Sequence, residues 1–257
     1  TGASNVALGD NALLSNTTGT ENVAAGNGAL QANTTGANNA ALGYQAMDAN
    51  TTGGSNVAVG SAALGANTTA SNNTAVGNGA LATNTTGAQM TAVGTSALAA
   101  STTATGCTAL GFRSLNDNTT GDWNIGVGYD ALGVNTTGAN NTAVGTFALD
   151  ANTTASNNTA VGYASLGATT VGNHCTALGY NAGLLTTGSR NTWLGALCGD
   201  ANTGGTNSVG VGYAALTNST ASNNTAVGAS ALAANTTGTN NVAVGNNASV
   251  ANNTGYS

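Results

Sequence analysis

The side chains that could do chemistry are few. The chain of 257 residues has eight acidic residues, one His and three Cys. Paired carboxylates could hydrolyse a glycosidic bond, a His beside a carboxylate could act as a general base, and thiolates could bind a metal ion. Whether any of these side chains meet depends on the elements that position them.

One motif repeats along the whole chain. Counting the Asn of N-x-A-V-G as position 1, fifteen repeats follow the consensus N-[TV]-A-[VL]-G-x-x-A-L-x-x-N-T-T-G-x-N, thirteen of them with 17 residues and two with 16. We expect each repeat to form one coil of a single repeat domain over residues 1–257. The repeats start at Asn5, Asn22, Asn39, Asn56, Asn73, Met90, Cys107, Asn124, Asn141, Asn158, Cys175, Asn191, Ser208, Asn224 and Asn241.

The repeat predicts an all-β parallel β-solenoid. Position 5 is always Gly, which indicates a positive φ or a close backbone approach, and position 2 is mostly β-branched, as strands prefer. We expect a strand at T-A-V, a Gly corner, a second strand at A-L, a turn at N-T-T-G, and about two large buried side chains per coil. Positions 4, 8 and 9 also have helical spacing, but such short segments with a Gly in each make poor helices.

In a solenoid, distance argues against catalysis by paired acids. Asp48, Asp150 and Asp200 share position 10 but lie six and three coils apart. At the spacing of paired strands the nearest two are about 14 Å apart, whereas an inverting glycosidase needs roughly 6.5–9.5 Å. Asp117 comes nearer to Asp150 but occupies a neighbouring column. His174, the only His, has no predicted carboxylate or nucleophile beside it.

The three cysteines are expected to be free thiols. Cys107 and Cys175 share position 1 but lie four coils apart, or roughly 19 Å, whereas a disulfide needs Cα atoms within about 7 Å. Cys198 occupies position 8, at a different corner. We therefore expect no catalytic residues, no metal site and no cofactor.

Composition excludes two classes of partner. Only 4% of residues are charged, the net charge is −6, and Arg113 and Arg190 are the only strong cations. Nucleic acid is disfavoured because its phosphates need basic patches. Membrane insertion is disfavoured because no apolar run approaches the roughly 18 residues of a membrane span. The nine N-T-T segments are formal glycosylation sequons, which we expect to serve as turns and side-chain ladders.

Aromatic residues gather at position 6. Exposed, they would form a ridge that stacks on sugars or on a partner protein. The alternative is packing against sister chains, and the sequence leaves both open. The candidate ridge comprises Tyr44, Phe112, Tyr129, Tyr163, Tyr180 and Tyr213, with Trp123 and Trp193 from the same part of the chain.

The unit N-[TV]-A-[VL]-G-x-x-A-L, for example N-V-A-V-G-S-A-A-L at 56–64, resembles a known family. It is similar to the head repeats of trimeric autotransporter adhesins, the YadA-like family, and to repeats in fibres of tailed bacteriophages. The resemblance covers nearly the whole chain. It implies a left-handed β-roll, three chains side by side, and an extracellular binding role. The repeat here is longer than the family's, with an added N-T-T-G corner.

We therefore expect a non-enzymatic structural and adhesive shaft of an extracellular fibre, either a phage tail fibre or a bacterial surface adhesin. It would be a self-assembling homotrimer whose polar surface attaches to a cell-surface glycan or protein. The alternative is an extracellular filament subunit that stacks end to end, because the array runs from Thr1 to Ser257 without a polar cap and would belong to a longer fibre. Ice binding ranks third, because T-T would present one Thr row where T-x-T presents two.

Overall fold

The computed structural model describes residues 2–250, and within that range it contains strands, turns and irregular backbone but no helix. Each of the fifteen strands has three residues and lies at T-A-V of its repeat. The predicted all-β parallel solenoid is confirmed. The strands are β1 Val6–Leu8, β2 Val23–Ala25, β3 Ala40–Leu42, β4 Val57–Val59, β5 Thr74–Val76, β6 Thr91–Val93, β7 Thr108–Leu110, β8 Ile125–Val127, β9 Thr142–Val144, β10 Thr159–Val161, β11 Thr176–Leu178, β12 Thr192–Leu194, β13 Val209–Val211, β14 Thr225–Val227 and β15 Val242–Val244.

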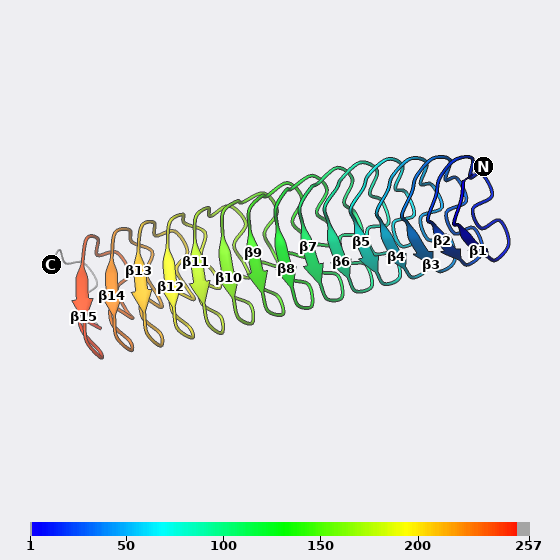
Figure 1. The fold of residues 1–257 in the computed structure, drawn as a ribbon. Coiled ribbons are helices and arrows are strands. Elements are labelled where there is room, and N and C mark those ends of the chain that lie inside the picture. The colour runs from blue at the N-terminus through cyan, green and yellow to red at the C-terminus, as the bar shows by residue number, and fades with distance from the viewer. Residues whose placement is uncertain (1, 251–257) are drawn as a thin grey trace. The chain divides into compact units, whose positions relative to one another are not determined.

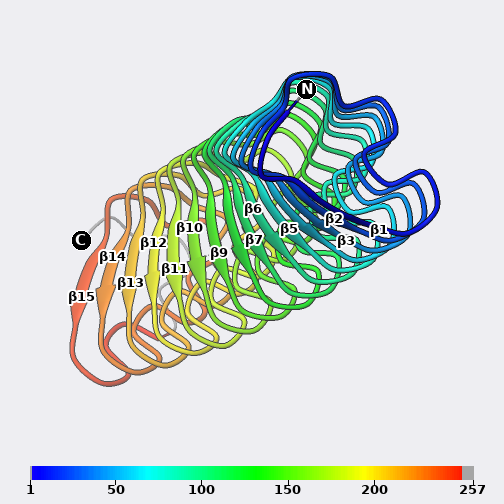
Figure 2. The same cartoon turned by 45° about the vertical axis from the view of Figure 1, so that its right-hand side comes forward.

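The chain forms two compact units, Thr1–Val127 with β1–β8 and Gly128–Ser257 with β9–β15. Within each unit the strands lie side by side, parallel and in chain order (Figure 1). The strands line one wall of the coils, and irregular backbone closes the other walls (Figure 2). That residues 1–257 act as a single repeat domain remains a prediction, and the expected lack of caps concerns Thr1 and Ser257, outside the described residues.

Strand register follows the repeat. Val57 pairs with Thr74, 17 residues later, and Thr176 pairs with Thr192 across one of the shorter repeats. Equal positions therefore stack coil on coil within each unit, as the repeat predicts.

Glycine ends each strand at position 5, where the sequence predicted either a positive φ or a close backbone approach. All fifteen of these glycines have φ between +127° and +142°, where L side chains are strained. A Cβ on Gly60 would also lie 2.5 Å from the carbonyl oxygen of Gly77 in the next coil. The chain can turn here only without a side chain.

The interior of each coil is narrow. Position 3 faces inward from the strand and is almost always Ala, for example the fully buried Ala75, whereas position 9 contributes one large side chain, such as the fully buried Leu81. Position 4 points outward, as the exposed Leu110 shows. The expectation of two large buried side chains per coil was therefore wrong, because a three-residue strand turns only its middle residue inward.

The expected second strand at A-L is absent from the described residues. Positions 7 and 9 instead have left-handed backbone, with φ +55° at Ala62 and +51° at Leu64, far from the negative φ of a strand. Bonding between coils continues, since the Leu64 amide donates to the Ala80 carbonyl at 2.9 Å. The left-handed residues bend the backbone into a corner and leave the Leu side chain in the core.

Two ladders of asparagine side chains run through the interior. At position 12, Asn67 Nδ2 donates to Oδ1 of Asn50 in the preceding coil at 2.8 Å and to the Ala70 carbonyl at 3.1 Å. At position 1, Asn73 Nδ2 donates to the Gly87 carbonyl and its backbone N donates to Asn56 Oδ1. These bonds satisfy amides that would be costly to bury alone.

The position 12 ladder also answers the question of the N-T-T sequons. Eight of the nine sequon asparagines are fully buried, and only Asn16 is partly exposed. In the folded chain those eight amides are buried, and a glycosylating enzyme would not reach them. They are Asn33, Asn50, Asn67, Asn84, Asn118, Asn135, Asn152 and Asn235.

Candidate ligand groove and exposed surfaces

Four aromatic rings form a continuous row on the second unit, which we call the aromatic row. The Tyr129 and Phe147 rings meet edge to face with centroids 5.3 Å apart, and Phe147 meets Tyr163 in the same way at 5.9 Å. Tyr163 and Tyr180 are stacked, 5.5 Å apart and 13° from parallel. The three tyrosines are 44–55% exposed, so the contacts between rings leave much of this surface open to a partner.

The sequence predicted three of these four rings. Phe147 was missed because it stands at position 7, one residue after Thr146, which occupies position 6 in that repeat. Its side chain nevertheless lies between the Tyr129 and Tyr163 rings. The signal available in the sequence was an aromatic residue one step away from an otherwise interrupted column.

The other residues of the candidate ridge are not all part of this row. Tyr213 is exposed on the second unit, but Ala196 occupies position 6 in the coil between it and Tyr180. Tyr44, Phe112 and Trp123 belong to the first unit, where each is exposed, and Trp123 stands in the position 17 column.

Trp193 corrects the predicted ridge, because it is fully buried. It replaces the usual Ala at position 3, the inward position of β12. The space it needs comes from Gly183 and Gly199, which replace Leu at position 9 in two successive repeats; a Cβ on either would collide with the indole. The indole Nε1 donates to Thr186 Oγ1 at 3.0 Å. Trp193 is a core residue and contributes nothing to the surface.

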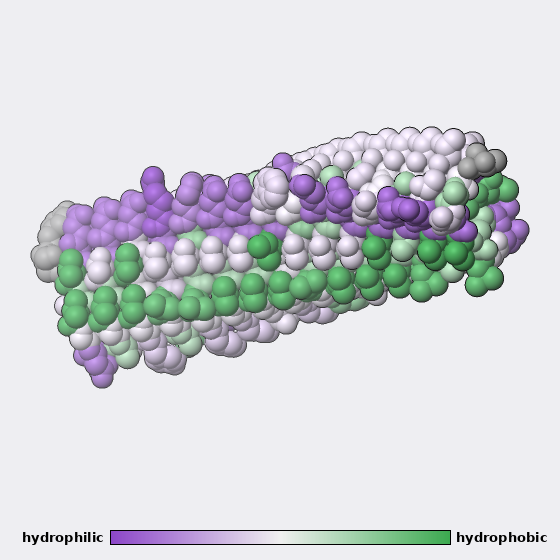
Figure 3. Space-filling view, in the orientation of Figure 1, coloured by the Kyte–Doolittle hydropathy of each residue, from purple (hydrophilic) through white to green (hydrophobic). Residues whose placement is uncertain are grey.

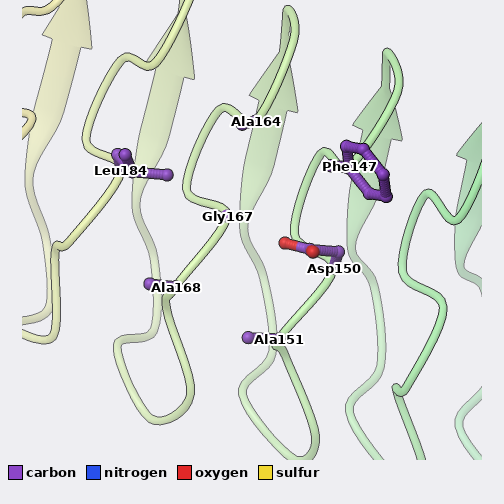
Figure 4. Close-up of a pocket in the computed structure, with 7 residues that line it drawn as sticks. All are labelled: Phe147, Asp150, Ala151, Ala164, Gly167, Ala168 and Leu184. Atoms are coloured by element: carbon purple, nitrogen blue, oxygen red, sulfur yellow. The ribbon is translucent and has the colours of Figure 1, made fainter.

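A shallow groove of about 380 Å³ opens beside the aromatic row. Phe147 and Leu184 stand on opposite sides, and between them the Asp150 carboxylate points over Gly167 (Figure 4). The remaining lining residues are small: Ala151, Ala164 and Ala168. The groove therefore combines apolar walls with one acidic side chain.

Burial is the main cause of the shifted pKa of Asp150, the acid in this groove. Desolvation raises the pKa of Asp150, hydrogen bonds from its own backbone N–H and that of Ala151 oppose the rise, and the negative charge of Asp130 adds to it. Burial likewise raises the pKa values of Asp48 and Asp200, which share position 10. A nearby cation or hydrogen-bond donor would stabilise the charged form of a carboxylate in such a place.

Glycine at position 10 of the following repeat makes room for the acid. A Cβ on Gly167 would lie 3.2 Å from Asp150 Oδ1 and 3.1 Å from Leu184 Cδ1. The groove thus depends on a missing side chain as well as on its two walls.

The cysteines are buried free thiols. At position 1, Cys107 Sγ donates to the Gly121 carbonyl and Cys175 Sγ to the Gly188 carbonyl, each at 3.2 Å, in the way that Asn side chains do in other repeats. Burial raises the pKa of Cys107 to about 11 and that of Cys198 to about 12, so these thiols stay protonated and unreactive at neutral pH.

The strands expose a second surface, which we call the strand face. It consists of the outward side chains at positions 2 and 4, and in each unit hydrophobic side chains gather in a row along the strands (Figure 3). In the first unit Val93, Leu110 and Ile125 are 37–40% exposed, and in the second Leu178 and Leu194 are 43–47% exposed.

The threonine columns proposed for ice binding are used partly by the fold. At position 13, Thr51 Oγ1 donates to the carbonyl of Thr68 in the next coil. Thr52, at position 14, is exposed. The N-T-T turns therefore expose the Thr row at position 14, whereas position 13 takes part in hydrogen bonds between coils.

Within residues 2–250, no group of three or more His, Cys, Asp or Glu side chains could hold a metal ion. No helix in that range is long and apolar enough to cross a membrane. Comparison with protein-family models and with curated protein sequences finds no match.

Proposed function

We propose that the chain is a non-enzymatic shaft segment of an extracellular fibre, in which copies pack side by side through the strand face. The observation that carries this proposal is the exposure of Val, Leu and Ile side chains along the strands of both units. Contiguous exposed apolar surface on a soluble protein marks an interaction site.

A second copy of the chain is the partner that best matches this surface. The strand face presents outward side chains at the same two positions of every coil, at the spacing of about 4.8 Å between paired strands. A partner can contact every coil in register only if it has the same period. Closed three-fold symmetry would bring the strand faces of three copies together around one axis, and the resemblance to trimeric adhesin repeats favours this number of chains.

The aromatic row supports an adhesive role for the shaft. Tyr129, Tyr163 and Tyr180 keep about half of their surface exposed, and exposed aromatic side chains are enriched where proteins bind partners. We propose that this row contacts a cell-surface glycan or protein. The three Asp of position 10 lie in separate coils, which favours a structural role over catalysis by paired acids.

The strand face can be tested by adding charge to it. Val93 and Leu110 are paired neighbours at position 4. We expect Val93→Glu/Leu110→Glu to convert the assembly to single chains, because the glutamates would be buried without partners between copies. The matched control is Asn78→Glu, which adds charge at an exposed position 6. Sedimentation velocity measures the outcome.

Two results would contradict side-by-side packing: wild-type protein that sediments as one chain, or a double variant that assembles as the wild type does. Circular dichroism should show that both variants retain the β-solenoid. If wild-type protein instead grew into long filaments with concentration and the double variant did the same, end-to-end stacking would replace the proposal.

A further inference from the structure

We propose that the groove beside the aromatic row binds a primary alkylammonium group, in the form of a lysine side chain of a partner protein. The inference rests on Asp150, Phe147 and Leu184, all within the second unit, and it goes beyond the fibre role. It does not require side-by-side packing of copies, because one chain supplies the whole groove.

The lining is complementary to the apolar stem and the charged end of a lysine side chain. Leu184 and the alanines can pack along methylene groups, while the Asp150 carboxylate can accept the hydrogen bonds of an ammonium (Figure 4). The Phe147 ring at the edge adds a surface that attracts cations. A volume of about 380 Å³ is at the smaller end of ligand pockets.

The floor offers few other polar groups, which argues against a sugar in this groove. Its backbone amides are already bonded: Gly167 N donates to the Ala164 carbonyl, Ala168 N to the Leu184 carbonyl, and Ala151 N to the Gly167 carbonyl. A pyranose carries several hydroxyl groups that lose water on binding and need replacement partners. An ammonium on an apolar stem needs one acceptor and apolar walls, which the groove provides.

Charge complementarity points the same way. The chain has a net charge of −6 and contains two Arg and no Lys. Asp150 lies near a second carboxylate, that of Asp130, whose charge makes ionisation of Asp150 less favourable. A cation entering the groove would be attracted by the Asp150 carboxylate and would compensate for its partial burial.

The chain contains a natural comparison for this site. Asp48 occupies the same repeat position as Asp150, and Gly65 stands opposite it, as Gly167 does for Asp150. The two wall positions differ, since Gln45 replaces Phe147 and Ala82 replaces Leu184. Asp48 therefore presents a half-buried acid without the apolar walls.

Ligand-observed NMR titration of the intact protein at constant ionic strength tests the proposal, with n-butylammonium as the probe. We expect millimolar binding that Asp150→Asn weakens at least about tenfold, because the neutral amide loses the charge-assisted hydrogen bond. Asp48→Asn, the matched control, should change the affinity less than about twofold, because Asp48 is half-buried like Asp150 but lacks the apolar walls of the groove. Gly167→Ala should also weaken binding by filling the floor.

Neutral n-butanol and tetramethylammonium separate the contributions of charge and hydrogen bonding. We expect both to bind less tightly than n-butylammonium. The proposal is wrong if n-butanol binds as well, if tetramethylammonium binds better, or if Asp48→Asn weakens binding as much as Asp150→Asn. Each of these results is readable whether the protein is a single chain or a trimer.

Discussion

At the scale of single residues, Trp193 and two glycines share one volume of the core. The indole fills space that Leu side chains occupy elsewhere, at the repeat positions of Gly183 and Gly199. This exchange of one large residue for two keeps the interior filled without widening the coil, as close packing requires.

Trp193→Ala should destabilise the chain by roughly 3–5 kcal/mol, the usual cost of removing a large buried aromatic side chain. Urea unfolding followed by circular dichroism measures the loss. Trp123→Ala, which truncates an exposed indole, is the control and should cost less. Adding Gly183→Leu and Gly199→Leu to Trp193→Ala should restore part of the stability; further destabilisation by these leucines would contradict a shared volume.

Asp200, an acid at position 10, should make the stability of the fold depend on pH. Burial raises the pKa of Asp200, and one of its carboxylate oxygens is buried without a hydrogen-bond partner. A raised pKa means that the folded state binds the proton more tightly, so this contribution to stability is present at low pH and is lost as pH rises through the folded pKa.

Asp200→Asn should therefore raise the melting temperature at pH 7 and give no gain near pH 3. The stabilisation should stay below about 1 kcal/mol, because solvent screens the part of Asp200 that is exposed. Thermal unfolding at both pH values measures the effect. A gain of equal size at the two pH values would show that ionisation of Asp200 is not the cause.

At the scale of the elements, position 9 combines a buried side chain with a left-handed backbone. Its Leu and Met residues have φ between +50° and +53°, a conformation that β-branched residues avoid. No Val, Ile or Thr occurs at this position in any repeat. The corner thus selects unbranched Cβ atoms as well as apolar character.

Leu81→Ile should cost about 1–2 kcal/mol more than Leu81→Met, because branching at Cβ adds strain to left-handed backbone at nearly constant volume. Met47 already occupies the same position in another coil, where it is fully buried. Parallel urea titrations of the two variants test this. Equal destabilisation by the two variants would mean that packing, and not backbone strain, explains the preference for Leu at position 9.

The sequence predicted the strand at T-A-V and its register, but it was wrong about a second strand at A-L. The period determines the register, and the invariant glycine marks the strand end, because both follow from backbone stacking. Hydrophobicity predicted two large buried side chains per coil, whereas the narrow interior holds Ala75 and Leu81 and leaves position 4, for example Val93, exposed. Trp193 and Phe147 were misplaced or missed because each depends on residues in adjacent coils, a relation that column-by-column reading does not capture.

At the scale of the whole molecule, the surfaces carry the proposed function. A chain with 4% charged residues has few charges to prevent association of its exposed apolar rows. We propose that assembly covers the strand face, and that the aromatic row and the groove of the second unit serve other partners. The two roles use different columns of the same repeat.

The mass of the unmodified protein in solution tests the central claim, that copies pack side by side through the strand face. Sedimentation equilibrium over a range of concentrations, with negative-stain electron microscopy of the same samples, should show discrete particles of three times the chain mass. A single chain at all concentrations would contradict the account, as would filaments that lengthen steadily with concentration.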